Sequence, residues 1–176
     1  MKHSLELFEQ PIPTLRAPQP EDGERVALLA KDDRKQAFGE LLGELSDFEQ
    51  FMNTSIVAEV DGEVVGAVLA YVPPYAPNTL NILQVVIHEN EENKGLGSLM
   101  LGQLMRRKVC AEITQVETTI SACDDVTWAL FRRFARWQRS RMEITPFFTQ
   151  ALQPRRRHEN DNQVTIQLAG ETNNPV

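Results

Sequence analysis

Several short stretches of the chain alternate apolar with polar residues, the two-residue period of β-strands. Residues 55–60 and 64–72 form two such stretches, and Asp61-Gly62 between them suits a tight hairpin turn. Residues 79–88 predict the next strand, followed by residues 113–120 and a last strand over 163–168. A short strand is also expected over residues 14–17.

Other stretches repeat apolar residues every three or four positions, the spacing of one helix face. A helix from Pro20 to Leu29 begins with acidic residues, and a second follows Phe38, Leu41, Leu45, Phe48 and Phe51 although Gly39 and Gly43 weaken it. A third helix opens at the glycines near residue 95, and Asp124 is a good N-cap for a fourth.

The predicted order is β, α, α, β, β, β, α, β, α and finally one or two strands. Consecutive hairpin strands followed by alternating strand and helix favour an α/β fold, a mixed sheet with helices packed on it. We expect an extended tail over residues 1–12, one domain over 13–170 and a frayed end over 171–176.

Composition narrows the class of protein. The 176 residues carry a net charge of −7, so a nucleic-acid partner is not expected, whereas a small cationic substrate is compatible. No apolar run is long enough to span a membrane and no secretory signal opens the chain, so we expect a cytoplasmic protein. Two cysteines without a Cys/His cluster predict neither a disulfide scaffold nor a metal site.

The strand ending at Ile87 leads through a polar loop into Lys94-Gly95-Leu96-Gly97, which opens a helix. Free amides and the positive end of the dipole meet at a helix N-terminus, and glycines let the backbone approach a phosphate closely. The pattern indicates a pyrophosphate site, although glycines of this kind also serve ordinary turns.

Two parts of the sequence together resemble the GNAT superfamily of acetyltransferases. Glu92, Gly95 and Gly97 stand at the positions of its acetyl-CoA loop, and Asp124 with Leu130-Phe131 matches its later helix. The resemblance, from about residue 15 to 134, implies a mixed, mostly antiparallel sheet of six to seven strands flanked by about four helices.

The same resemblance implies a set of residues that hold acetyl-CoA. The strand residues are expected to pair with the pantetheine, the loop amides to hold the pyrophosphate, and the later helix to flank both. These residues are Val85, Val86 and Ile87; Asn93, Lys94, Gly95, Leu96, Gly97 and Ser98; and Asp124, Thr127 and Phe131.

A narrower resemblance points to the diaminobutyrate acetyltransferases of ectoine biosynthesis. It rests on stretches such as Tyr71-Val72-Pro73-Pro74, Gln84-Val85-Val86 and Glu117-Thr118-Thr119-Ile120. It implies acetylation of the γ-amine of L-2,4-diaminobutyrate by a homodimer, with Phe148 and His158 near the substrate.

Three positions and one longer stretch depart from these families. Glu92 replaces the usual Arg or Gln and places a carboxylate near the phosphates, Asp124 replaces an Asn but keeps the helix cap, and Phe131 replaces a Tyr that often protonates the thiolate. The stretch from Ala37 to Glu40 lacks the tyrosines expected near the acceptor pocket, which leaves the acceptor amine open.

Acetylation of an amine needs a group that takes a proton from the ammonium. Gln115, Glu117 and Thr119 share one face of their strand, and Glu117 is the candidate base or ammonium anchor, unless that face is simply solvated. Gln84 is a second catalytic candidate, and Gln84, Glu117 and Thr119 are expected to contact substrate. His88 and Cys123 lie nearby, but an exposed turn and packing explain them as well.

Two other functions fit the same residues. A catalytically silent acyl-CoA-binding module would explain Glu92 and Phe131, and an acetyltransferase for another amine or a protein lysine would share the cofactor loop.

Overall fold

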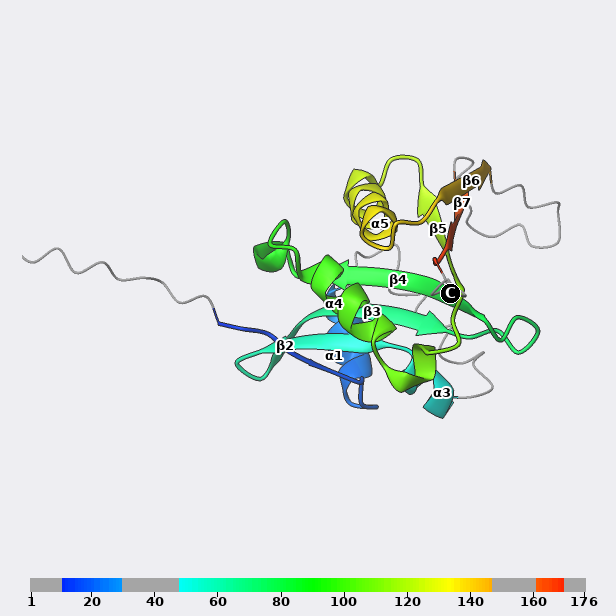
Figure 1. Cartoon of the computed structure of the whole chain (residues 1–176). Helices are drawn as coiled ribbons and strands as arrows, with labels where there is room; N and C mark the ends of the chain where they lie inside the picture. Colours follow the sequence, from blue (N-terminus) through cyan, green and yellow to red (C-terminus); the bar gives the residue numbers. More distant parts are fainter. Residues whose placement is uncertain (1–10, 30–47, 147–160, 170–176) are drawn as a thin grey trace, which may run out of the picture.

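The computed structural model describes residues 11–29, 48–146 and 161–169. Within these ranges seven strands form one sheet (Figure 1). The strands are β1 (Thr14–Arg16), β2 (Ile56–Val60), β3 (Glu63–Tyr71), β4 (Thr79–Ile87), β5 (Gln115–Ser121), β6 (Met142–Pro146) and β7 (Asp161–Gln167). The helices are α1 (Asp22–Leu29), α3 (Phe48–Asn53), α4 (Leu96–Met105) and α5 (Asp125–Trp137), with short 3-10 turns η1 (Glu89–Glu91) and η2 (Lys108–Cys110).

The sheet has the order β1-β2-β3-β4-β5-β7-β6. Every neighbouring pair is antiparallel except β4 and β5, which are parallel. The predicted mixed, mostly antiparallel sheet is therefore confirmed. The hairpin between β2 and β3 is also confirmed, because Asp61 and Gly62 both have positive φ, 50° and 82°, as a type I′ turn requires.

Helices cover both faces of the sheet. Because successive side chains of a strand point to opposite faces, strands such as β3 and β4 pack against helices on both sides. One face packs against α4 and α5, where Met100, Leu104 and Phe131 are fully buried. The other face packs against α1 and α3 through Val26 and Phe51. The first part of the predicted second helix, up to residue 47, lies outside the described residues.

No helix in the described ranges is both long and apolar enough to cross a membrane.

An ion-pair network ties β1, α1 and β2 together. Arg16 donates to both carboxylate oxygens of Asp22, at 2.6 and 2.9 Å, and to Glu59 Oε2 at 2.8 Å. Asp22 is only 2% exposed and also accepts the Gln19 amide at 2.7 Å. The hydrogen bonds from Arg16 hold the pKa of Asp22 below its ordinary value, against the opposing effect of burial.

We expect Asp22→Asn to lower the free energy of unfolding by about 2 kcal/mol, because half-buried Arg16 loses the more buried of its two charged partners and keeps only Glu59. Urea denaturation at pH 7 measures the change, and Glu21→Gln, an exposed neighbour, is the control. Equal effects of the two substitutions would contradict this role.

The pH dependence has a defined sign. Because the folded pKa of Asp22 lies below the ordinary value of 3.8, its contribution is complete above that pH and lost as the pH falls through the folded pKa. Asp22→Asn should therefore flatten the loss of stability below about pH 4, which denaturation curves at successive pH values would show.

Candidate functional site

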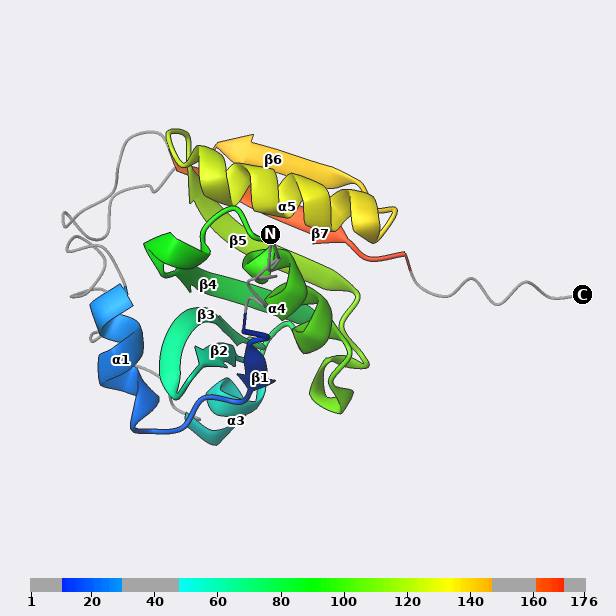
Figure 2. The same cartoon turned by 90° about the vertical axis from the view of Figure 1, so that its left-hand side faces the viewer.

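The parallel strands β4 and β5 pair only along their first halves. Thr79 to Ile82 of β4 pair with Gln115 to Thr118 of β5, and the pairing ends there. Both strands continue, β4 to Ile87 and β5 to Ser121, and Figure 2 shows them parting towards their carboxyl ends. The edge of β4 over residues 83–87 therefore presents backbone groups that β5 does not satisfy.

A β-bulge lies where the strands part. Leu69 of β3 pairs with Gln84, whereas the next residue, Ala70, pairs with Ile82, so Leu83 is the extra residue. A bulge bends its strand and increases the local twist, which turns β4 away from β5. As the partner of Leu69, Gln84 faces the same side of the sheet as α1.

The loop between β4 and α4 exposes several amides at one place. Asn93 and Gly95 adopt left-handed conformations, with φ of 62° and 81°. The first hydrogen bond of α4 runs from the Leu99 amide to the Gly95 carbonyl at 3.0 Å. The amides of Leu96, Gly97 and Ser98 therefore have no partner within the helix and point out of its positive end.

Gly97 brings this helix end close to β4 and α5. A Cβ atom at this position would lie 3.1 Å from Leu130 and 3.2 Å from Ile87 side-chain atoms. Only glycine lets α4 start this close to the end of β4. The free amides of α4 and the free edge of β4 are thus neighbours.

Two buried polar atoms in the described part of the chain lack a hydrogen-bond partner, and both belong to this site. They are Gln84 Nε2, beside the bulge, and Ser98 Oγ, in the first turn of α4. Buried polar groups are almost always hydrogen-bonded in folded proteins, so orphans in this position indicate a site shaped for a ligand.

A row of polar side chains crosses the sheet on the side of α1. Tyr71, Asn81 and Glu117 are successive register partners on β3, β4 and β5, so their side chains share this face with Gln84. Gln115 Nε2 donates to Glu117 Oε1 at 2.6 Å, which orients the carboxylate. Burial, with smaller contributions from Tyr75 and Glu117, raises the pKa of Tyr71.

Tyr71 and Asn81 were not predicted from the sequence as residues of the site, although Tyr71 belongs to one of the stretches that carry the resemblance. The hairpin turn at Asp61-Gly62 fixes the register of β3 against β2. The bulge in β4 shifts the register of the next pair by one residue, so the residues that align with Glu117 could not be predicted from the sequence.

The other predicted residues occupy varied environments. Asp124 caps α5, accepting the Thr127 amide at 3.0 Å and its hydroxyl at 2.7 Å. Phe131 is fully buried in the core beside α4. Thr119 is exposed, which places the outer end of the β5 face in solvent.

The strand residues beside the gap divide between the two faces. Val85 and Ile87 pack towards α4 and α5, and Val86 belongs to the cluster around α1. A ligand that enters between β4 and β5 would therefore contact the backbone of these β4 residues more than their side chains.

Charge around the loop is mixed. Glu92 is exposed, and Lys94 Nζ lies 3.3 Å from Glu91 Oε1. His88 accepts the Asn90 amide through Nδ1 at 3.2 Å, so it caps the short turn η1. Among the described residues no cluster of His, Cys, Asp and Glu could hold a metal ion. Phe148, His158 and the stretch 37–40 lie outside the described residues.

This arrangement can bind a long anionic ligand in an extended form. The free edge of β4 offers alternating donors and acceptors for amide groups, and the α4 amides suit phosphates. Glu117 pairs with Asn81 just before the gap and faces the side of α1, where its carboxylate can accept a proton.

Known proteins share both the sequence and the fold. The sequence profile of the acetyltransferase (GNAT) family matches residues 18–135. The chain is 31% identical to the L-2,4-diaminobutyric acid acetyltransferase of Shouchella clausii, covering 91% of this chain and 89% of that protein. It is 37% identical to the enzyme of the same name from Halomonas elongata over 70% of this chain and 66% of that one.

Solved structures give the same picture. Diaminobutyrate acetyltransferase EctA from Paenibacillus lautus, solved with L-2,4-diaminobutyric acid and coenzyme A, superposes with a TM-score of 0.77 at 26% identity, covering 90% of this chain and 96% of that chain. Ard1 from Thermoplasma volcanium superposes with a TM-score of 0.64 at 16% identity, covering 90% of this chain and 99% of that chain. At this identity the likeness concerns the fold alone.

Proposed function

The chain belongs to the GNAT family of acetyl-CoA-dependent N-acetyltransferases, and from this premise we propose that its acceptor is the γ-amine of L-2,4-diaminobutyrate. The product would serve ectoine biosynthesis. The observation that supports the proposal is the parting of β4 and β5 beside the free amides of α4, with the carboxylate of Glu117 next to the point where the strands part.

Acetyl-CoA fits the residues present. The backbone of Val85 and Ile87 would pair with the pantetheine amides, and the amides of residues 93–98 would hold the pyrophosphate. Ser98 Oγ, buried without a partner, supplies one more polar group at that position. When bound, acetyl-CoA supplies an activated acetyl group as a thioester.

The acceptor side of the mechanism rests on Glu117 and Gln84. The substrate ammonium must lose a proton before its nitrogen can attack, and the Glu117 carboxylate, oriented by Gln115, is placed to take it. The buried Gln84 amide would donate to an oxygen atom of the substrate. The C–N bond forms as the C–S bond breaks, and the released thiolate takes its proton from water.

A panel of amines tests the acceptor. Thiol release from acetyl-CoA should be fastest with L-2,4-diaminobutyrate and slower with ornithine, lysine and simple diamines, and NMR of the product should place the acetyl group on the γ-nitrogen. Preference for another amine would replace the proposed substrate. Saturable coenzyme A binding without turnover on any amine would instead identify a binding module.

Glu92 gives a separate prediction about acetyl-CoA. Because it adds a negative charge near the loop amides, Glu92→Gln should tighten binding by about two- to fivefold, and more at low salt. Titration calorimetry measures the change, with Glu112→Gln, an exposed residue at the opposite end of β4, as the control. Unchanged affinity would mean that the Glu92 carboxylate lies beyond reach of the phosphates.

The expected homodimer and the cytoplasmic location are further parts of this proposal. Both rest on the resemblance to the diaminobutyrate enzymes, and the free thiols of Cys110 and Cys123 are compatible with a reducing compartment. Light scattering after size exclusion measures the oligomeric state.

A further inference from the structure

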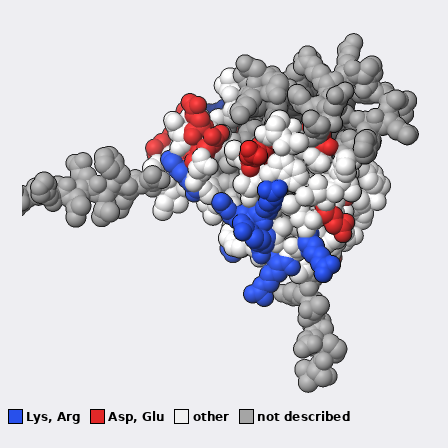
Figure 3. All heavy atoms as spheres, turned by 90° about the horizontal axis from the view of Figure 1, so that it is seen from above, with Lys and Arg blue, Asp and Glu red and all other residues white. Residues whose placement is uncertain are grey.

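Five exposed arginines lie together on the C-terminal half of α5 and the turn that follows it. We call them the arginine patch, and they are Arg132, Arg133, Arg136, Arg139 and Arg141. None of them lies within salt-bridge distance of a carboxylate in the described part of the chain. Figure 3 shows basic side chains gathered on this face of the molecule, although the whole chain carries a net charge of −7.

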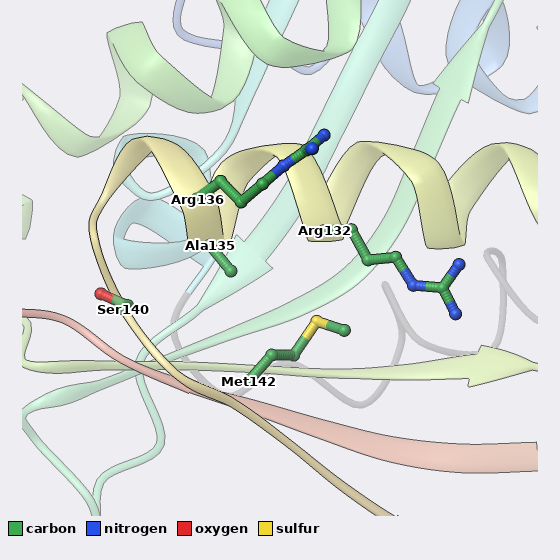
Figure 4. A pocket seen from close by; sticks show the side chains of 5 residues that line it. All are labelled: Arg132, Ala135, Arg136, Ser140 and Met142. Atoms are coloured by element: carbon green, nitrogen blue, oxygen red, sulfur yellow. The ribbon is translucent and has the colours of Figure 1, made fainter.

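A pocket of about 350 Å³ opens within the patch, between α5 and β6. Arg132 and Arg136 project from α5 and Met142 from β6, and Figure 4 shows the two guanidinium groups pointing in different directions. Ala135 and Ser140 complete the lining. Ala135 is buried and Met142 half-buried, so the wall is apolar where the rim is cationic. The pocket is shallow and open to solvent, so a small ligand would be held mainly by the cationic rim.

The parts of the pocket are held in place. The guanidinium of Arg132 lies 5.4 Å from the ring centroid of Trp128, and Trp128 Nε1 donates to the Ser121 carbonyl at 3.0 Å. Below the pocket, the Ser140 amide donates to the Ala135 carbonyl at 2.9 Å and closes the end of the helix.

The turn also contains an unusual residue. Arg139 has a φ of 52°, a left-handed conformation in a position that glycine most often takes after a helix. This conformation is sterically unfavourable for arginine and lowers the local stability of the turn. It places the Arg139 cation next to Ser140, which lines the pocket.

The positive charges of the arginine patch favour a ligand with negative charge. Arg132 and Arg136 stand four residues apart on one helix face, where like charges repel. We propose that this pocket binds a small organic dianion, a dicarboxylate or a phosphate monoester, through Arg132 and Arg136. Its short carbon chain would lie on Ala135 and Met142. The pocket is separate from the acetyl-CoA loop, which lies at the start of α4.

Titration calorimetry at matched ionic strength tests the proposal with succinate and glycerol 3-phosphate as probes. We expect saturable binding of at least one probe, and the tighter of the two identifies the class of ligand. The double variant Arg132→Gln/Arg136→Gln should weaken it at least about tenfold, because two charge-assisted contacts are lost. Arg106→Gln/Lys108→Gln removes the same charge from exposed positions elsewhere and should leave the affinity unchanged.

Two controls keep the result interpretable. The affinity of the Arg132/Arg136 variant for coenzyme A should equal that of the wild type, which shows that the variant is folded. Arg132→Lys/Arg136→Lys keeps the charge but loses the planar guanidinium fork, and should also weaken the probe. Three results would overturn the proposal: no saturable binding of either probe, equal losses in both neutralised variants, or full affinity in the lysine variant.

Discussion

Glu117→Gln is expected to lower the turnover number for acetyl transfer by about 100-fold or more while leaving the affinity for acetyl-CoA unchanged. The amide keeps the size and hydrogen-bonding shape of the carboxylate but cannot accept the ammonium proton. Since Glu117 faces the side of α1, away from the α4 amides, its loss should spare the cofactor. Steady-state kinetics with L-2,4-diaminobutyrate, together with calorimetry for coenzyme A, would measure the two effects separately.

Glu143→Gln provides a matched control for this substitution. Glu143 pairs with Thr165, which pairs with Glu117, so both carboxylates stand in one row on the same face of the sheet. Glu143 lies on the exposed edge strand β6, and its substitution should leave turnover unchanged. Unchanged turnover in Glu117→Gln would remove Glu117 from the mechanism. A rise in the acceptor KM alone would make Glu117 an anchor for the ammonium instead of a base.

Much of the fold could be predicted because local patterns agree with the tertiary structure. The alternation in β2 and β3, with Asp61-Gly62 between them, predicts the hairpin, and Asp124 predicts the start of α5. The strand β6 could not be located, because it has only five residues, ends in Pro146 and leaves four of the five exposed, so its short apolar alternation is no clear signal. Pairing with β7 stabilises it as a strand, and that contact is not visible in its own sequence.

The site was predictable in its residue types but not in its geometry. The bulge at Leu83 could not be predicted from the sequence pattern. β4 is covered by helices on both faces, so the residues around the bulge, apart from Gln84, are apolar whichever face they point to, and an extra residue does not interrupt an alternation. Gly97 was predicted as a point of approach for phosphate, and the structure adds a packing reason, the contact with Ile87 and Leu130. The face shared by Gln115, Glu117 and Thr119 follows directly from the strand period, yet its partial exposure depends on tertiary packing.

Gly95→Val is expected to abolish measurable binding of coenzyme A, a loss of at least about 100-fold. Gly95 has a φ of 81°, and a Cβ atom there would meet no protein atom within 4 Å. The substitution would therefore clash with nothing inside the protein. It would instead place a branched side chain on the open side of the loop, where the phosphates approach, and pull the neighbouring amides out of their left-handed turn.

The hairpin turn provides a control in which the same strain occurs without the ligand. Gly62 has a φ of 82° and equally open surroundings, so Gly62→Val should destabilise the fold about as much, by about 2 kcal/mol, because the left-handed conformation is unfavourable for any L-residue with a Cβ. Urea denaturation would establish that the two variants are equally stable, and calorimetry would then compare their affinities for coenzyme A. If Gly95→Val binds coenzyme A as well as Gly62→Val does, the phosphates do not lie on the amides of this loop. If only Gly95→Val loses binding, a general loss of stability cannot be the cause, because both variants carry it. The loss then belongs to the loop at the start of α4, through the position of its amides or the side chain in the path of the ligand.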